Sequence, residues 1–153
     1  RPVAWLAVRS LAATLSLAAT ITHAAGSTPP GATTYQAECG SCHTAYPSRF
    51  LKPADWGRVL ATLDGHYGTD ATLDAAALDA IARHLGASAQ SARATSATTL
   101  PRITRNPWFL EEHDEIPAAK FKSPAVSSAA NCSACHTGAE RGDFDERSVR
   151  IPK

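Results

Sequence analysis

The pentapeptide Cys-x-x-Cys-His occurs twice in this chain, as Cys39-Gly-Ser-Cys42-His43 and as Cys132-Ser-Ala-Cys135-His136. This is the spacing at which c-type haem is attached to protein. Two thiols form thioether bonds with the vinyl groups of the porphyrin, and the imidazole that follows binds the iron from the proximal side. The sequence therefore predicts two covalently bound haem c groups (iron). They are attached through Cys39, Cys42, Cys132 and Cys135, with His43 and His136 as proximal iron ligands.

The chain contains no methionine. A methionine axial ligand raises the potential of the common cytochromes c, so each iron here must take another sixth ligand or keep an open position. Six histidines are present. Two follow the cysteine pairs and His23 lies in an apolar N-terminal stretch, which leaves His66, His84 and His113 for the remaining axial positions.

His66 and His113 are each predicted to lie on the apolar face of a helix, where a ligand can pack on a porphyrin. Apolar residues recur at helical spacing over 54–66, and His66 falls seven residues after Val59 on the same face. A shorter helix is expected to run from Asn106, an N-cap followed by proline at the first helical position, through His113. Both histidines are therefore suited to approach an iron from its distal side.

His84 belongs to a further predicted helix over 73–85, which Thr72 would cap and Gly86 would end. On a helical wheel it falls within the apolar sector, so geometry alone does not exclude it. The residue pattern thus offers three candidates for two axial positions.

The remaining sequence predicts a mainly α chain with much irregular structure. A short helix over 33–39 leads into the first motif, a turn-rich stretch follows over 45–53, and the region 114–131 is mostly loop. The segment 87–100 consists almost entirely of small and polar residues and is predicted to be a linker. No alternating strand pattern persists along the sequence.

The N-terminal segment 1–25 is predicted to be a signal peptide for export. Arg1 and Arg9 supply positive charge, an apolar stretch follows, and small residues near Ala24 suit a signal peptidase. The apolar run is too short and too rich in threonine for a comfortable membrane span. Since covalent haem attachment in bacteria takes place outside the cytoplasmic membrane, we expect a protein of the periplasm that does not span the membrane after cleavage. An uncleaved anchor is the alternative.

Charge and size narrow the function classes further. Without Arg1 and Arg9, 13 basic residues stand against 14 acidic ones, and no basic stripe points to nucleic acid as a partner. The segments 26–86 and 101–153, on either side of the linker, are too small to bury much apolar surface unaided. A covalently attached haem would give each of them apolar core surface and a covalent cross-link. We therefore expect two small haem-cored domains.

Longer blocks around both motifs resemble the bacterial dihaem cytochrome c family of small exported electron carriers. In the first half the blocks are Cys39 through Pro47, Trp56, and Leu63 through Gly68. In the second half they are Pro101 through Trp108, Glu112-His113, Asn131 through His136, and Gly142 through Pro152. The resemblance covers essentially the whole chain after the signal segment, except the linker.

The resemblance implies an N-terminal domain with the helical class I cytochrome c fold, a small irregular, loop-rich C-terminal haem domain, and bis-histidine ligation of both irons. His66 and His113 match the family's distal histidines, whereas His84 falls where the family tends to carry an aromatic residue and is expected to pack. Sequence proximity pairs His66 with the first haem and His113 with the second. The implied function is that of a low-potential electron carrier, not an enzyme. Its implied partners are redox proteins such as a membrane b-type cytochrome or another small exported haem protein.

Several side chains are candidates for holding the porphyrins. Arginines could pair with haem propionates, and aromatic rings could pack against the macrocycles, although each is also an ordinary solvated charge or core residue. The candidates are Arg102, Arg105, Tyr46, Trp56, Tyr67 and Trp108.

Four alternatives compete with this interpretation. The cysteine pairs could bind zinc, form local disulfides, or exchange disulfides as in thioredoxin, which would require a strand-to-helix turn that the sequence does not predict. Within haem chemistry, an enzyme or gas-binding protein would need one open or labile axial site with polar distal groups. Two well-placed distal histidines favour closed sites and electron transfer.

Overall fold

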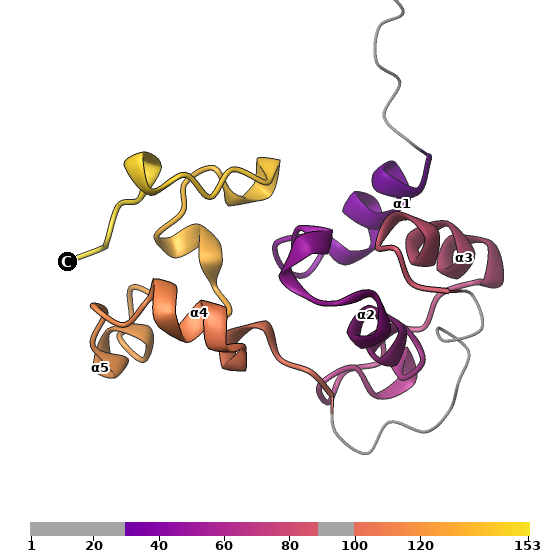
Figure 1. The fold of residues 1–153 in the computed structure, drawn as a ribbon, viewed down its shortest axis with the longest axis horizontal. Coiled ribbons are helices and arrows are strands. Elements are labelled where there is room, and N and C mark those ends of the chain that lie inside the picture. The colour runs from indigo at the N-terminus through magenta and orange to yellow at the C-terminus, as the bar shows by residue number, and fades with distance from the viewer. Residues whose placement is uncertain (1–29, 89–99) are drawn as a thin grey trace, which may run out of the picture.

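The computed structural model describes residues 30–88 and 100–153. Over these ranges the chain forms five α-helices and several short 3-10 turns, with no β-strand, so the predicted mainly α fold is confirmed. The described residues fall into two groups that lie side by side, an N-terminal half (30–88) and a C-terminal half (100–153) (Figure 1). The predicted signal peptide 1–25 and residues 89–99 of the predicted linker lie outside the described residues.

The N-terminal half is built on helices α1 (Pro30–Cys39), α2 (Pro53–Leu60) and α3 (Ala75–His84). Helix α1 begins before the predicted residue 33, because Pro30 is tolerated in a first turn and Gly31 allows close packing on α3. A side-chain carbon at Gly31 would clash with the backbone oxygen of Ala80. The core of this half is formed by Tyr35, Leu51, Trp56, Val59, Leu60, Ile81, Ala82, Leu85 and Ala87.

The helix predicted over 54–66 is too long. Helix α2 ends at Leu60, and a separate 3-10 turn covers Leu63–Gly65, so His66 lies beyond the helix. The Thr62 hydroxyl donates to the carbonyls of Arg58 and Val59, at 3.1 and 3.3 Å, which offers the backbone an alternative to further helical hydrogen bonds.

The predicted cap of the next helix is also wrong. Asp74, not Thr72, caps α3, because its carboxylate accepts a hydrogen bond from the Ala77 N–H at 2.8 Å. The Thr72 hydroxyl instead donates to Asp70. Helix α3 therefore begins at Ala75.

The C-terminal half has little regular structure. Its helices are α4 (Pro107–Glu112) and α5 (Ala118–Phe121), the second of which lies in a region predicted as loop. Asn106 stands at the N-cap of α4 as predicted, but its side chain makes no capping bond and donates to the Phe50 carbonyl at 3.4 Å. The buried hydrophobic residues of this half are few: Phe109, Val126 and Ala139.

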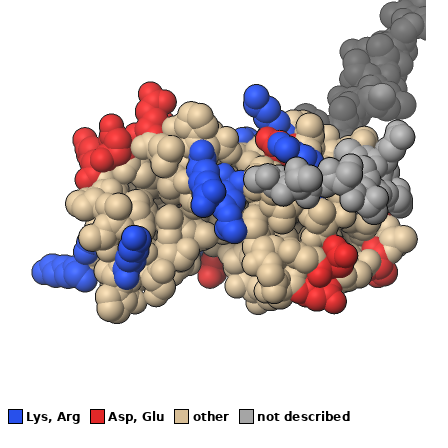
Figure 2. Space-filling model, turned by 90° about the horizontal axis from the view of Figure 1, so that it is seen from below, with Lys and Arg blue, Asp and Glu red and all other residues tan. Residues whose placement is uncertain are grey.

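Phe50 joins the two halves. It belongs to a 3-10 turn of the N-terminal half, yet its ring lies 5.0 Å from Trp108 and 4.9 Å from Phe144, measured between ring centroids. Phe50 is only 9% exposed. The face shown in Figure 2 carries small separate groups of both charges rather than one extended patch. Among the described residues, no helix is long and apolar enough to cross a membrane.

Candidate haem sites

The structure brings four histidines together in two facing pairs. The ring centroids of His43 and His66 are 6.2 Å apart, and those of His113 and His136 are 6.1 Å apart. Two imidazoles that bind one metal ion from opposite sides, with metal–nitrogen bonds of about 2.0 Å, have ring centres about 6 Å apart. Both pairs therefore have the spacing that a shared metal ion requires. We call the His43–His66 pair site 1 and the His113–His136 pair site 2.

His84 belongs to neither pair. Its ring lies 5.3 Å from the ring of Tyr35, where α3 packs on α1. It is not among the described residues that line the cavity of site 1.

A tight turn presents His66, rather than a helix face as predicted. After the 3-10 turn at Leu63–Gly65, the His66 N–H donates to the Leu63 carbonyl at 3.4 Å and the His66 carbonyl accepts from the Thr69 N–H at 3.0 Å. The turn continues through Tyr67 and Gly68, which both have positive φ, at 49° and 100°. Glycine adopts such angles freely, whereas an aromatic residue does so rarely.

Helix α4 ends at Glu112, one residue before the predicted end, so His113 directly follows the helix rather than lying in it. Its ring stacks on Phe109, one helical turn earlier, with centroids 4.1 Å apart and an interplanar angle of 19°. Its Nδ1 lies 2.8 Å from the Phe109 carbonyl oxygen. Because Phe109 is buried, these contacts hold the His113 ring in one orientation.

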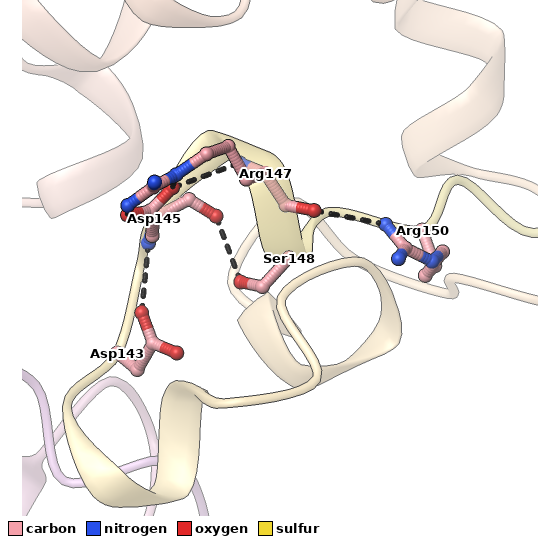
Figure 3. A network of polar contacts seen from close by, with 5 residues as sticks. All are labelled: Asp143, Asp145, Arg147, Ser148 and Arg150. Atoms are coloured by element: carbon pink, nitrogen blue, oxygen red, sulfur yellow. Dashed lines mark hydrogen bonds and ion pairs between the residues drawn. The ribbon is translucent and has the colours of Figure 1, made fainter.

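The C-terminal segment supports His136 from behind. Asp145 accepts hydrogen bonds from the backbone and guanidinium of Arg147, and its own N–H donates to Asp143, which folds this segment into a compact loop (Figure 3). The loop leads to a bridge between Val149 and His136 and to a 2.8 Å hydrogen bond from the Arg150 N–H to the Cys135 carbonyl. The proximal turn of site 2 is thereby fixed to the end of the chain.

Hydrogen bonding prepares one imidazole of each pair for metal binding. His43 Nδ1 lies 2.7 Å from the Thr44 carbonyl oxygen, as His113 Nδ1 lies against that of Phe109. Since a carbonyl only accepts, Nδ1 carries a hydrogen in both rings, and Nε2 is the nitrogen left for a metal. A partner of this kind commonly orients metal-binding histidines.

The other imidazole of each pair is half-buried and has a buried nitrogen without a partner. His66 Nδ1 and His136 Nδ1 have no hydrogen-bond partner among the described residues. Burial and, to a smaller extent, the neighbouring histidine lower the pKa of both His66 and His136. A lowered pKa favours the neutral ring, which is the form that binds metal.

Each pair opens onto a large cavity. The cavity of site 1 has a volume of about 1020 Å³ and that of site 2 about 870 Å³, at the upper end of the range for small-molecule pockets. Site 1 is lined mainly by the N-terminal half but also by Arg102, and site 2 mainly by the C-terminal half but also by Phe50. The two cavities share a wall formed by Ile103, Ser128, Asn131 and Cys132.

The cysteines lie where thioether attachment requires them. Cys39 and Cys42 line the cavity of site 1, Cys135 lines that of site 2, and Cys132 lines both. All four are free thiols in the structure. Burial raises the pKa of Cys39 and of Cys132 to about 11, with nearby Glu38 adding to the effect at Cys39. Reactive thioredoxin-like cysteines have lowered pKa values instead.

The zinc alternative finds no support in the geometry of the described residues. A structural zinc site needs four protein ligands around one point, and the described ranges contain no group of three or more His, Cys, Asp or Glu side chains placed to hold a metal ion. A pair of imidazoles beside a large cavity instead suits a metal whose other ligands come from a macrocycle bound in that cavity. The residues present therefore fit haem.

The other predicted haem neighbours are only partly placed at the cavities. Tyr46, Trp56, Tyr67 and Arg102 line the cavity of site 1, and Trp108 lines that of site 2. The guanidinium of Arg102 lies 4.5 Å above the Tyr67 ring. Arg105 is not among the described residues that line either cavity.

Sequence reasoning missed the residues that join the halves at the sites. Phe50 reaches into the cavity of site 2, and Phe144 lies between it and His136, with ring centroids 5.2 Å from the latter. A phenylalanine in a turn-rich stretch carries no pattern that points to a partner almost a hundred residues away. Periodicity reports on local elements only.

A helical fold, with no strand among the described residues, has two cavities that are each lined by a Cys-x-x-Cys-His motif and a facing pair of imidazoles. These features define a c-type cytochrome with two haem sites. The chain belongs to the dihaem cytochrome c family, whose family model matches residues 35–144. It carries two covalently bound haem c groups with iron, as the two motifs predict. Family membership indicates an electron-carrier role.

Solved structures agree with this assignment. The chain is similar to a dihaem cytochrome c from Shewanella baltica, with 41% identity and a TM-score of 0.65, over 80% of this chain and 94% of that one. It is also similar to two structures of dihaem cytochrome c from Rhodobacter sphaeroides. One has 36% identity and a TM-score of 0.59, over 73% of this chain and 95% of that one. The other has 38% identity and a TM-score of 0.56, over 73% and 96%. A comparison with curated protein sequences gives no significant match.

Proposed function

We propose that this protein is a carrier of single electrons in which both irons are closed by two histidines. His43 and His66 are the ligands of the first haem, and His113 and His136 those of the second, with attachment through Cys39, Cys42, Cys132 and Cys135. The spacing of the two facing imidazole pairs, 6.2 and 6.1 Å between ring centroids, carries this proposal.

The bound haems supply a one-electron Fe(III)/Fe(II) couple, and the protein's part is to hold the ligands still. The Thr44 and Phe109 carbonyls fix the rings of His43 and His113 through Nδ1. Histidines that are held in place on both sides of an iron leave little ligand rearrangement between oxidation states, which suits electron transfer. The wall that both cavities share, with Cys132 in it, keeps the two sites close enough for transfer within the molecule.

Further properties belong to the same proposal. Imidazole in place of a methionine thioether favours low potentials. The sequence features of segment 1–25 support export to the periplasm. The partners we propose are other redox proteins, such as a membrane b-type cytochrome or a small exported haem protein.

The proposal is tested by the absorption spectrum of the reduced holoprotein before and after addition of carbon monoxide. We expect no change, because neither iron offers a free or labile position. A shift at one haem would overturn the closed-site proposal in favour of gas binding or peroxide chemistry.

The two sites are expected to give different electron paramagnetic resonance signals in the oxidised protein. The imidazole planes make an angle of 20° at site 1 and 67° at site 2. Nearly parallel rings donate into the same iron d orbital and split the d-orbital pair, which gives a rhombic signal. Nearly perpendicular rings leave the pair almost degenerate, which gives a strongly anisotropic signal with one large g value. Two signals of the same kind would contradict the ring angles.

A further inference from the structure

Two tyrosines connect the imidazoles of site 1 to the C-terminal half. The Tyr46 ring stacks on His43, with centroids 5.0 Å apart and an interplanar angle of 18°, and the Tyr67 ring meets His66 edge to face at 4.8 Å. Each hydroxyl donates a hydrogen bond to a backbone carbonyl of the other half. The acceptors are Ala130 for Tyr46, at 2.9 Å, and Pro101 for Tyr67.

Tyr67 is held in a backbone conformation that tyrosine rarely adopts. Its φ of 49° lies in the left-handed region, which persists only where the surroundings fix it. The surroundings that do so come from the C-terminal half. The Pro101 carbonyl accepts the hydroxyl hydrogen, and the Arg102 guanidinium lies 4.5 Å above the ring. The turn that presents His66 is thus fastened at its next residue.

Tyr46 is held by hydrogen bonds at its backbone carbonyl and at its side-chain hydroxyl. Its carbonyl accepts a hydrogen bond from the buried Tyr35 hydroxyl at 2.8 Å, while its own hydroxyl reaches Ala130. Ala130 lies two residues before Cys132, the first attachment cysteine of the second haem.

Site 2 is arranged differently. Among the described residues, the aromatic neighbours of its imidazoles, other than the two histidines themselves, are phenylalanines: Phe109 and Phe121 for His113, and Phe144 for His136. Phenylalanine rings pack but donate no hydrogen bond. The hydroxyl contacts described above are therefore a property of site 1.

We propose that Tyr46 and Tyr67 are positioning residues through which the C-terminal half sets the orientation and the retention of both axial histidines of the first haem. This inference rests on the proposed ligation by His43 and His66. Tyr67 holds the distal His66 on the iron, and Tyr46 fixes the plane of the proximal His43 ring. The second half of the protein then contributes to the ligand field of a haem that it does not itself attach.

The test uses the full holoprotein with Tyr67→Phe and Tyr46→Phe, which keep each ring and remove only the hydroxyl. In Tyr67→Phe, we expect cyanide to displace the distal ligand of the oxidised first haem about fivefold faster, the factor that one ordinary hydrogen bond is worth. In Tyr46→Phe, the paramagnetic resonance signal of site 1 is expected to shift or broaden while that of site 2 is unchanged. Asn106→Ala is the matched control, because it removes a hydrogen bond between the halves that involves neither imidazole pair.

The outcomes separate the two proposals. If both tyrosine variants keep the native cyanide rate and the native site 1 signal, or if Asn106→Ala changes these as much as they do, the positioning role is wrong. If the unmodified reduced protein binds carbon monoxide at site 1, the ligation by His66 fails first, and the positioning role fails with it. Native closure together with faster cyanide binding in Tyr67→Phe would support both.

Discussion

In the His66→Gly variant, the reduced first haem is expected to bind one molecule of carbon monoxide per chain, while the second haem stays closed. The substitution removes the ring that faces His43 at 6.2 Å and leaves open space beside the cavity. Glycine can adopt the backbone φ of −53° that His66 has in the turn. The measurement is the absorption spectrum before and after carbon monoxide, in which half of the haem should shift.

Two further measurements test whether the effect comes from the loss of the His66 ligand. Added imidazole should restore the low-spin spectrum of the oxidised variant, because it replaces the missing ligand in the same space. His84→Gly serves as the matched control and should leave the spectrum unchanged, since His84 packs against Tyr35. A His66→Gly protein that stays low-spin and binds no carbon monoxide would show that another residue is the ligand.

The sequence was sufficient to predict what short-range rules govern. The two pentapeptides located the haem sites, and the absence of strand patterns gave the mainly α fold. The pairing of His66 with the first motif and of His113 with the second stays a prediction about ligation. The structure places the rings at distances that suit it.

Other features depended on competition between side-chain and backbone hydrogen bonds, which the spacing of apolar residues does not reveal. Apolar spacing continued to residue 66, yet the Thr62 hydroxyl competes for the carbonyls at the end of α2 and the helix stops at Leu60. Likewise Asp74 rather than Thr72 caps α3, because the Asp74 carboxylate accepts from the Ala77 N–H while the Thr72 hydroxyl donates to Asp70. Both errors concern helix ends, where hydrogen bonding to side chains outweighs propensity.

Contacts between the halves could not be predicted from the sequence, for a different reason. Tyr46 and Tyr67 were candidates either for packing against porphyrins or for ordinary core packing. Their hydroxyl bonds to Ala130 and Pro101 join residues 84 and 34 positions apart. Whether a surface tyrosine finds such a partner depends on how the halves meet, and a single sequence holds no record of that. The same holds for Phe50 and its ring partners in the C-terminal half.

Phe50→Ala is expected to destabilise the protein by about 3–4 kcal/mol, as is usual for truncation of a buried phenylalanine. The ring is 9% exposed and fills the space between Trp108 and Phe144, so its loss leaves a cavity at the junction of the halves. Because Phe144 also contacts His136, the second haem should change its spectrum and potential more than the first. Urea unfolding followed at the haem absorption band, together with a redox titration, measures both effects.

Leu110→Ala is the matched control for this prediction. Leu110 lies on α4 in the C-terminal half and is 58% exposed, and surface truncations usually change stability by about 0.5 kcal/mol or less. If Phe50→Ala lowers the free energy of unfolding no more than Leu110→Ala does, this contact does not stabilise the junction of the halves. Phe50 then merely covers the cavity of site 2. If the first haem shifts as much as the second, the effect of Phe50 spreads through the whole interface, Tyr46 and Tyr67 included, rather than through Phe144.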